Sequence, residues 1–573
     1  MTSDKIEAEN PNANLKDYRA AKNTFSWEDL EKEFTWSSTG KVNIVHEAVD
    51  RWAEDPIRGA LDALVFEKNG KVERFTYKNL KEKSAQLANF FQQHGLQTGD
   101  RLFIFLPPCP EIFLAMLACA RLGVIYSPLY STLNYQELEV RCRNGEPKAF
   151  LTHPHLAEQL PLDETSSLDF VFLTEGPALN LKTPEIIIAG QWESLGAECQ
   201  PKWVSCDTEL YLLYTSGSTG PPKGVVHSHQ DMVGHLATGR YALDLNPGTV
   251  FWADADPAWV TGTVYAAFSA WLCGAASVAL GDQPSASTCY RALEQLQVEV
   301  WYTTPSRLNL LVEAGEDLPG RYDLSRLRHI ATVGETLSAE TFHWIGKNLG
   351  LTPHETWWMT ETGMISLANF PSLEVKPGSM GRPFPGVEAA ILDGNGLPQP
   401  ALTLGELALK AGWPAMTSGI WRDERRYRDY FRFQGWFLTG DMALCDEDGY
   451  FFHQGRNDDL IKVGQRLIGP FEIEHILARH PAVGEAAVIS KLTPSSKMSV
   501  KAFVTLKSGL KPSTRLNLEL KDFVRANLSS EPTLFEVGFI AELPKTRSGK
   551  LLRRVLRAKE MALPRGDAAE LEE

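Results

Sequence analysis

A stretch rich in hydroxyl groups and glycine follows a short apolar run in the first half of the chain. It reads YTSGSTGPPKG, from Tyr214 to Gly224, and LYLL precedes it. Glycine lets backbone N–H groups approach a ligand closely, and the serine and threonine hydroxyls add donors, so the segment suits the oxygens of a polyphosphate. Lys223 adds a positive charge. The spacing does not match the G-x-x-x-x-G-K-[ST] phosphate loop, and from composition alone a surface turn remains the alternative.

Three later segments combine charged residues with tight turns. HETWWMTETG, residues 354–363, places two tryptophans beside a Thr-Glu-Thr-Gly run without apolar period; GWFLTGD ends at Asp441, and LPKTRSGK ends at Lys550. A lone lysine is usually a solvated surface residue, and an aspartate after a turn is often a turn residue or a helix cap. A doubled tryptophan is often core packing. Taken one at a time, these residues therefore leave a structural role open.

Seven motifs occur in a fixed order between Tyr214 and Lys550. They are YTSGSTGPPKG, DPAWVTG (256–262), VGE (333–335), TWWMTETG (356–363), GWFLTGD (435–441), GRNDD (455–459) and LPKTRSGK (543–550). In this set and order the sequence resembles the acetyl-CoA synthetases of the adenylate-forming superfamily, and most closely their shorter, bacterial type. Ala258 stands where glycine is common in that family, and Thr336 where proline is usual. The first two hundred residues are compatible with the family but carry fewer diagnostic positions.

The resemblance implies a ligase that works in two half-reactions. The carboxylate of acetate attacks the α-phosphate of ATP to give an acetyl-adenylate and pyrophosphate, and the thiolate of coenzyme A then displaces AMP. The overall reaction is readily reversible. Such transfers depend on positioning and on charge neutralisation, and the resemblance implies Mg²⁺ as the cation. A propionate-preferring or other short-chain acyl-CoA synthetase, and a nucleotide-binding relative impaired in CoA transfer, remain the alternatives.

The resemblance also assigns roles to individual residues. Lys550 would reach the α-phosphate and acyl oxygens, the Thr215–Lys223 loop would hold the β- and γ-phosphates, and Glu361 would ligate Mg²⁺. Asp441 and Arg456 would bind the ribose hydroxyls. As alternatives, Glu361 caps a helix and Arg456 pairs with a nearby aspartate at the surface. The full set expected at ATP and AMP is Thr215, Ser216, Gly217, Ser218, Thr219, Gly220, Gly334, Glu335, Thr336, Glu355, Thr356, Trp357, Thr360, Asp441 and Arg456.

Trp358 is the residue from which we predict the size of the acid. Superfamily members that activate longer acids usually carry glycine at this position, so a tryptophan would leave room for a tail of two or three carbons. Val260, Thr261 and Val333 match the other walls of a small acyl pocket. A single methylene is worth only ~1–3 kcal/mol in such a pocket, so acetate over propionate is expected as a preference. Ordinary core packing is the alternative for Trp358, and packing is the only structural role expected of Trp357.

The segment IKVGQRLIG departs from the family pattern G-x-R-[IV]-G by one extra residue. Aligned on Gly464 and Arg466, which we favour, it keeps both residues for the pantetheine tunnel of coenzyme A. Aligned on Gly469, it replaces the family's glycine and arginine with Gln465 and Leu467. CoA transfer is therefore the less secure half-reaction.

Helical and strand-like patterns alternate through the first part of the chain. Residues 76–100 show helical apolar spacing, and RLFIFLPPC and PEIFLAMLACARLGVIYSPLY read as a strand and as a helix followed by a strand. Such alternation predicts an α/β fold of mainly parallel sheets covered by helices. Further strands are expected at EIIIAG, SVALG, EVWYTT, HIATVG and VEAAILDGNG.

A fresh mixed pattern begins after the turn-rich CDEDG. GPFEIEHILARHP and NLELKDFVRANL read as helices, and VGEAAVIS and SVKAFVTLK as strands, which predicts a small α+β unit. We therefore expect an N-terminal adenylation domain, residues 1–457, with the ATP and acyl sites, and a C-terminal domain, residues 458–573, with Lys550. The resemblance implies that the small domain is mobile and takes one closed pose for each half-reaction, with a hinge at Asp458.

Composition excludes several classes of protein. The formal net charge of -15 argues against nucleic acid as a partner, because binding phosphates needs a basic surface. The eight cysteines form no C-x-x-C pair, which favours a reducing compartment and free thiols. The N-terminus lacks the apolar region of a secretory signal, so we expect a cytoplasmic enzyme with small-molecule substrates. Its oligomeric state stays open.

One uncharged segment is long enough to suggest a membrane helix. It runs from Pro257 to Gly281. Its proline, glycines and small residues fit better with a loop, a buried helix ending at Gly274 and a short strand. We therefore predict a buried helix and keep a membrane span as the alternative.

Overall fold

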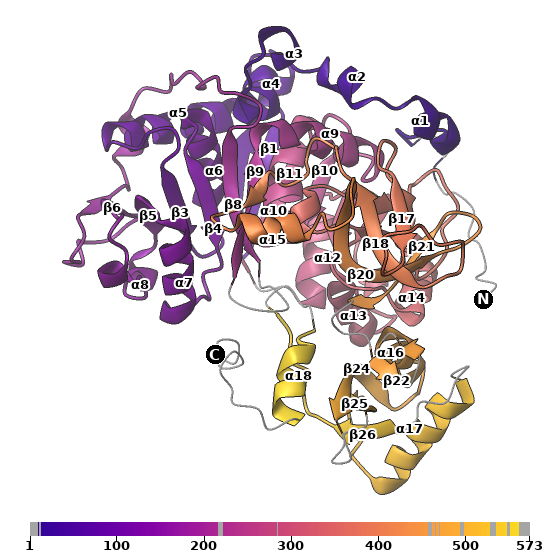
Figure 1. Cartoon of the computed structure of the whole chain (residues 1–573). Helices are drawn as coiled ribbons and strands as arrows, with labels where there is room; N and C mark the ends of the chain where they lie inside the picture. Colours follow the sequence, from indigo (N-terminus) through magenta and orange to yellow (C-terminus); the bar gives the residue numbers. More distant parts are fainter. Residues whose placement is uncertain are drawn as a thin grey trace.

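The computed structural model describes residues 10, 13–215, 222–282, 285–456, 461–463, 466–468, 470–492, 498–527, 535–546 and 551–560. They form a large N-terminal domain, in which helices surround two extended sheets, and a smaller C-terminal domain at one end of it (Figure 1).

The first sheet of the N-terminal domain has nine strands, in the order β16-β15-β14-β13-β12-β10-β11-β1-β2. The pairs from β14 to β1 are all parallel, whereas β2, β15 and β16 join antiparallel at the edges. The bounds are β1 (Asp62–Lys68), β2 (Lys71–Thr76), β10 (Val250–Ala253), β11 (Ala276–Leu280), β12 (Val300–Thr303), β13 (His329–Thr332), β14 (Pro353–Trp357), β15 (Leu367–Ala368) and β16 (Arg382–Pro383).

The second sheet has eight strands, in the order β19-β9-β8-β4-β3-β5-β6-β7. It is parallel from β8 to β7, and β9 and β19 extend it antiparallel. The bounds are β3 (Arg101–Phe105), β4 (Ile125–Leu129), β5 (Ala149–Thr152), β6 (Phe170–Leu173), β7 (Glu185–Ile187), β8 (Glu209–Thr215), β9 (Lys223–Ser228) and β19 (Gly419–Ile420).

Both sheets are buried on two faces, which explains why their strands read as nearly continuous apolar runs. On β12, Val300 and Tyr302 face the central core between the sheets, and Trp301 faces the outer core. Side chains alternate along a strand, so one strand serves two cores. The central helices are α5 (Tyr77–Gln93), α6 (Pro110–Leu122) and α9 (Met232–Tyr241); the outer helices are α7 (Tyr135–Gly145), α8 (Pro154–Ala157), α12 (Ala286–Gln295), α13 (Pro305–Ala314) and α14 (Ala339–Leu349).

The uncharged segment Pro257–Gly281 is a buried helix followed by a strand, as predicted. The helix runs through α10 (Val260–Thr263), the π-helical η6 (Val264–Ser269) and α11 (Ala270–Leu272). It ends at Gly274, whose φ of 73° suits glycine, and β11 follows. Within the described residues, no helix is both long and apolar enough to cross a membrane.

A third, four-stranded sheet completes the N-terminal domain. Its order is β17-β18-β20-β21, with bounds β17 (Ala389–Leu392), β18 (Gly405–Lys410), β20 (Trp436–Cys445) and β21 (Phe451–Arg456). The helix α15 (Glu424–Asp429) leads into β20. The N-terminal strap of α1 (Tyr18–Thr24), α2 (Trp27–Glu31), α3 (Trp36–Thr39), η1 (His46–Asp50) and α4 (Arg51–Ala53) was not expected from the sequence.

The C-terminal domain is the predicted small α+β unit. A three-stranded sheet of β24 (Val483–Leu492), β25 (Met498–Leu506) and β26 (Phe535–Phe539) packs with α16 (Pro470–Ala478), α17 (Thr514–Asn527) and α18 (Arg553–Glu560). β22 (Ile461–Val463) and β23 (Arg466–Ile468) pair antiparallel. The boundary itself, at residues 457 and 458, lies outside the described residues and stays a prediction. All eight cysteines are free, as expected.

Candidate active site

The predicted site residues gather where strands of all three sheets end. β12, β13 and β14 are adjacent and parallel, so their carboxyl ends share one edge, where ligands bind in open α/β sheets. Val333 and Trp358 directly follow β13 and β14. Lys223 opens β9 in the second sheet, and Asp441 and Arg456 lie opposite each other on β20 and β21 in the third.

Lys223 and Glu361 form a buried ion pair. Glu361 sits in the short turn η8 (Thr360–Thr362), and its Oε1 contacts the ammonium group of Lys223. The side chains are only 11% and 5% exposed. Tyr430 joins them: its hydroxyl accepts a hydrogen bond from Lys223 and donates one to Glu361 Oε1 at 2.9 Å. The Lys223 ammonium also lies 5.0 Å from the centre of the Tyr430 ring.

This arrangement keeps Glu361 ionised. Burial alone would raise the pKa of Glu361, but the charge of Lys223 and the hydrogen bonds from Lys223 and Tyr430 outweigh it and hold the pKa below its ordinary value. Burial and the neighbouring Glu361 carboxylate raise the pKa of the Tyr430 hydroxyl well above its usual range. The site therefore holds a carboxylate, an ammonium group and a neutral phenol, close together and largely shielded from water.

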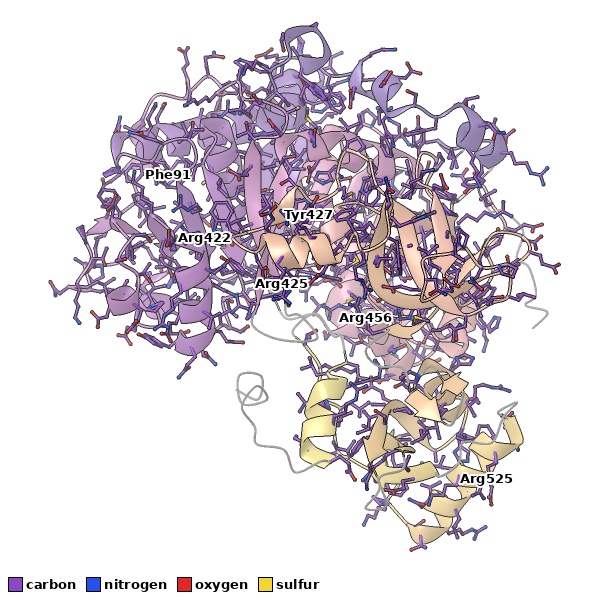
Figure 2. The ribbon with its side chains drawn as sticks, viewed as in Figure 1. Phe91, Arg422, Arg425, Tyr427, Arg456 and Arg525 are labelled. Carbon is purple, nitrogen blue, oxygen red and sulfur yellow. The ribbon has the colours of Figure 1, made fainter. Side chains whose placement is uncertain are left out.

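Asp441 is held by three side chains. Arg456 Nη1 donates to Asp441 Oδ1 at 2.6 Å, the indole N–H of Trp357 donates to Oδ2 at 2.9 Å, and His453 Nε2 lies 3.6 Å from Oδ2. Figure 2 shows Arg456 on the side of the N-terminal domain that faces the C-terminal domain. Arg456 thus pairs with Asp441 on the adjacent strand. Packing is not the whole role of Trp357, because its indole orients the carboxylate expected at the ribose.

Trp358 points the other way, into aromatic surroundings. Its indole N–H donates to the Tyr302 hydroxyl at 2.9 Å, and its ring lies edge-on to Tyr265, with 5.0 Å between the ring centres. The Tyr302 hydroxyl also shares a 2.7 Å hydrogen bond with Thr356, whose own hydroxyl donates to the Thr332 carbonyl. Trp358 is therefore locked in place by neutral hydrogen bonds and ring contacts.

Of the other predicted acyl-pocket residues, Val333 follows β13 at this edge, and Val260 and Thr261 begin α10. Val260, Thr261 and Val333 are all buried. The Thr261 hydroxyl has no hydrogen-bond partner among the described residues. Its place in the acyl pocket stays a prediction. Gly334 has a φ of 88° and packs against Trp259, so a side chain there would be strained and crowded.

Glu355 was expected at the nucleotide, but its side chain turns into the protein. Its two oxygens accept hydrogen bonds from the backbone N–H groups of Leu337 and Gly378, each at 3.1 Å. Burial raises the pKa of Glu355 to about 8, although both backbone donors lower it. This carboxylate therefore fixes the backbone after β13 and after β15, and its contact with a nucleotide stays a prediction.

Glu335 lies where the two domains approach each other. Its Oε2 accepts a hydrogen bond from the Ser306 hydroxyl at 2.6 Å, and burial raises its pKa. The charges of Lys545 and Glu485 in the C-terminal domain also act on it. A residue expected at the nucleotide is thus within electrostatic reach of the segment that leads to Lys550.

Several predicted residues lie outside the described residues. They are Ser216, Gly217, Ser218, Thr219, Gly220, Asp458, Gly464 and Lys550, and the side chain of Arg466 belongs with them. Thr215 ends β8 opposite Lys223 on β9, so two paired strands flank the glycine-rich stretch. Gly464 and Gln465 connect β22 to β23, and the choice between the two alignments stays open.

Two site residues escaped the sequence reasoning. Tyr430 lies between α15 and β20 and belongs to none of the seven motifs, although it is only a few residues from GWFLTGD. Tyr302 lies in EVWYTT, which was read only as a strand. The signal that could have found Tyr302 is its place at the end of a central parallel strand, where ligand contacts are common.

The charged groups fit a magnesium ion that takes most of its ligands from substrate. Among the described residues, no group of three or more His, Cys, Asp or Glu side chains could hold a metal. Mg²⁺ bound with a nucleotide usually takes one or two carboxylates and completes its shell with phosphate oxygens and water. Glu361 supplies one ionised carboxylate beside the cationic Lys223. The chemistry of the donor set is therefore suitable for Mg²⁺.

The chain is similar to known enzymes over nearly its whole length. A family model described as AMP-binding enzyme matches residues 50–421, and one described as AMP-binding enzyme C-terminal domain matches residues 472–550. The acetyl-coenzyme A synthetase of Bacillus subtilis (strain 168) is 42% identical over 565 residues, covering 98% of both chains. The acetyl-coenzyme A synthetase of Methanothrix thermoacetophila is 35% identical, covering 94% of this chain and 86% of its own.

Solved structures show the same architecture. The anthranilate CoA ligase AuaEII, in complex with anthranoyl-AMP, superposes with a TM-score of 0.82 at 25% identity, covering 91% of this chain and 98% of its own. An acyl-CoA synthetase of Brucella canis gives a TM-score of 0.74 at 29% identity, with 95% and 99% covered. The similarity thus extends over both domains.

Proposed function

The chain belongs to the AMP-binding enzyme family, and we propose that it is an AMP-forming acetate–CoA ligase. It converts ATP, acetate and coenzyme A to acetyl-CoA, AMP and pyrophosphate through an acetyl-adenylate. The observation that carries the substrate assignment is the locked Trp358, held by Tyr302 and Tyr265 at the ligand-binding edge of the sheet. The similarity over nearly the whole chain to proteins named acetyl-coenzyme A synthetase supports the reaction.

In the first half-reaction, the residues of the N-terminal domain position charge. Lys223 binds the β- and γ-phosphates of ATP, and Glu361 is the ligand for Mg²⁺, which neutralises phosphate charge when bound. Asp441, oriented by Arg456 and Trp357, accepts hydrogen bonds from the ribose hydroxyls. The buried side chains around Trp358 exclude water from the acyl end of the intermediate.

In the second half-reaction, the C-terminal domain takes a different pose. Lys550 acts at the α-phosphate and acyl oxygens during adenylation, and Asp458 is the hinge about which the domain turns to admit coenzyme A. With Asp458→Pro, adenylate formation should persist while CoA-dependent AMP release collapses. Equal loss of both half-reactions would reject the hinge.

The substrate assignment is tested by enlarging the pocket. Trp358→Gly should raise kcat/KM for butyrate relative to acetate, because the removed indole makes room for a longer tail. Trp192→Gly is the matched control, since the two tryptophans are similarly buried, at 6% and 8% exposed, and Trp192 lies in the short helix η4 (Trp192–Ser194), which packs on α5 and contains no predicted site residue. If the ratio of butyrate to acetate activity is the same in both variants, the pocket assignment fails.

One pair of assays separates the alternatives. ATP–pyrophosphate exchange over acetate, propionate and butyrate reports adenylation, and CoA-dependent AMP release reports thioester formation. A propionate preference would show in both assays. A relative impaired in CoA transfer would show exchange without AMP release. We also propose a cytoplasmic location without nucleic-acid partners, from the acidic net charge and the free thiols.

A further inference from the structure

The turn that carries Glu361 is held by hydrogen bonds to its backbone carbonyls as well as by the contacts of the Glu361 side chain. Three consecutive carbonyls, those of Thr360, Glu361 and Thr362, each accept a hydrogen bond from a different residue. The donors are His227 Nε2 at 2.8 Å, the Thr417 backbone N–H at 2.9 Å and the Trp413 indole N–H at 2.8 Å. Gly363 closes the turn with a φ of 68°, and a Cβ there would collide with the Ala415 carbonyl.

His227 is the one of these donors that lies on the strand of Lys223. Residues four apart on a strand share a face, so Lys223 and His227 both point from β9 toward the turn. Lys223 contacts the side chain of Glu361, and His227 contacts the backbone one residue earlier. β9 therefore contacts the turn at two points, at the Glu361 carboxylate and at the backbone carbonyl of the preceding residue.

The His227 ring is itself oriented by a buried aspartate. Its Nδ1 lies 2.6 Å from Asp231 Oδ2, and both side chains are fully buried. The other Asp231 oxygen accepts a hydrogen bond from the Ser228 hydroxyl at 3.0 Å, and the ring stacks on Tyr211 with 4.8 Å between centres. A carbonyl only accepts hydrogen bonds, so Nε2 carries a hydrogen and Nδ1 shares a proton with Asp231.

We propose that His227, oriented by Asp231, is a positioning residue that sets the Glu361 carboxylate for the metal–nucleotide complex. Partners of this kind orient metal ligands, and their loss typically costs 10–100-fold in metal affinity or activity. The proposal rests on the proposed function only through the assignment of Glu361 to the metal. It does not depend on which acid is activated.

Two variants separate the contact with the turn from the contact with Asp231. In His227→Gln, the amide nitrogen takes the place of Nε2 and still donates to the Thr360 carbonyl. In His227→Asn, the amide takes the place of Nδ1, so it faces Asp231 and leaves the carbonyl without its donor. Binding of Mn²⁺·ATP is measured by calorimetry at several Mn²⁺ concentrations, together with the unfolding temperature and the KM for acetate.

The affinity for Mn²⁺·ATP should fall about 10- to 100-fold in His227→Asn. In His227→Gln it should stay within a few-fold of wild type. The KM for acetate should change little in both. His229→Asn is the matched control: His229 is fully buried in the same segment and accepts a hydrogen bond from the Ile44 N–H instead, so its variant should keep the affinity.

Two results would overturn this role. One is the same Mn²⁺·ATP affinity in His227→Asn and His227→Gln. This includes the case in which both affinities equal that of wild type, and the case in which both decrease together with the unfolding temperature. The other is an equal loss in His229→Asn, which would mark a general effect of repacking. If wild-type protein itself fails to bind Mn²⁺·ATP, the proposed function is overturned as well, and that outcome is visible before any variant is compared.

Discussion

Glu355 and Glu361 lie six residues apart, on either side of the paired tryptophans, and both are buried. Their pKa values nevertheless shift in opposite directions. Glu355 accepts hydrogen bonds from two backbone N–H groups and forms no ion pair among the described residues; burial raises its pKa to about 8. Glu361 is as deeply buried but faces Lys223, and its pKa is lowered.

The difference indicates that a neighbouring cation, rather than the extent of burial, determines whether a buried carboxylate stays ionised. Backbone dipoles alone do not offset the desolvation of Glu355, whereas a full positive charge does so for Glu361. One carboxylate therefore organises the backbone, and the other presents a charge to a ligand. The following changes test that division.

The largest effect is expected from Glu361→Gln. It removes the proposed metal ligand and leaves Lys223 buried without its counter-charge, so ATP–pyrophosphate exchange should fall on the order of 10²–10³-fold. Glu355→Gln, the matched control, should keep exchange within a few-fold wherever the protein is folded. Comparable losses of exchange activity in the two variants would contradict the assignment of a catalytic role to Glu361 and a structural role to Glu355.

The second test uses the pH dependence of stability. The pKa of Glu355 in the folded protein, about 8, lies above its ordinary value of 4.5, so between these pH values the folded state holds a proton that the unfolded state has released. The free energy of unfolding should therefore fall, by a few kcal/mol, as pH rises from about 5 to about 8. Glu355→Gln should flatten this slope in denaturant titrations; parallel curves would contradict the raised pKa.

Tyr430→Phe should have a smaller effect. The ring that faces the Lys223 ammonium remains, but the hydroxyl that joins Lys223 to Glu361 is lost, at a cost of about 1–1.5 kcal/mol or roughly tenfold in exchange rate. Tyr290→Phe is the control, because the buried Tyr290 hydroxyl has no hydrogen-bond partner among the described residues. An unchanged exchange rate in Tyr430→Phe would show that the Lys223–Glu361 ion pair does not need the Tyr430 hydroxyl.

The smallest effect is expected from Trp357→Phe. It removes one of the hydrogen bonds to Asp441 and leaves the Arg456 contact, so the KM for ATP should rise several-fold with little change in kcat. Steady-state kinetics over ATP concentration measure this. A change confined to the KM for acetate would instead place Trp357 at the acyl site.

Much of this architecture could be predicted from the sequence, because the strands are buried on both faces and the motifs lie at strand ends. The parallel sheets, the small C-terminal domain and the helix within Pro257–Gly281 are confirmed. The pairing of Lys223 with Glu361 could not be predicted, since β9 and η8 belong to distant segments that meet only through tertiary packing. The same holds for Tyr430, whose neighbours in sequence show no pattern related to phosphate or metal.

Glu355 shows a second limit. The motif places it beside Thr356 and Trp357, but the direction of its side chain depends on the backbone N–H groups of Leu337 and Gly378, which sequence spacing does not reveal. For Trp357, the sequence indicated packing, and the partner Asp441 comes from another sheet. Sequence alone thus missed the roles that depend on which distant segments meet in the fold.

The paired tryptophans connect two sheets. The Trp357 indole N–H donates a hydrogen bond to Asp441 on β20, which is expected at the ribose. The Trp358 indole N–H donates one to Tyr302 on β12, beside the predicted acyl pocket. Because the two tryptophans are consecutive in the chain, they connect these points on two sheets through a single peptide bond. We therefore expect a displacement of Asp441 to be transmitted through the tryptophans to Tyr302, so that a substitution at the predicted ribose contact also alters acid selectivity.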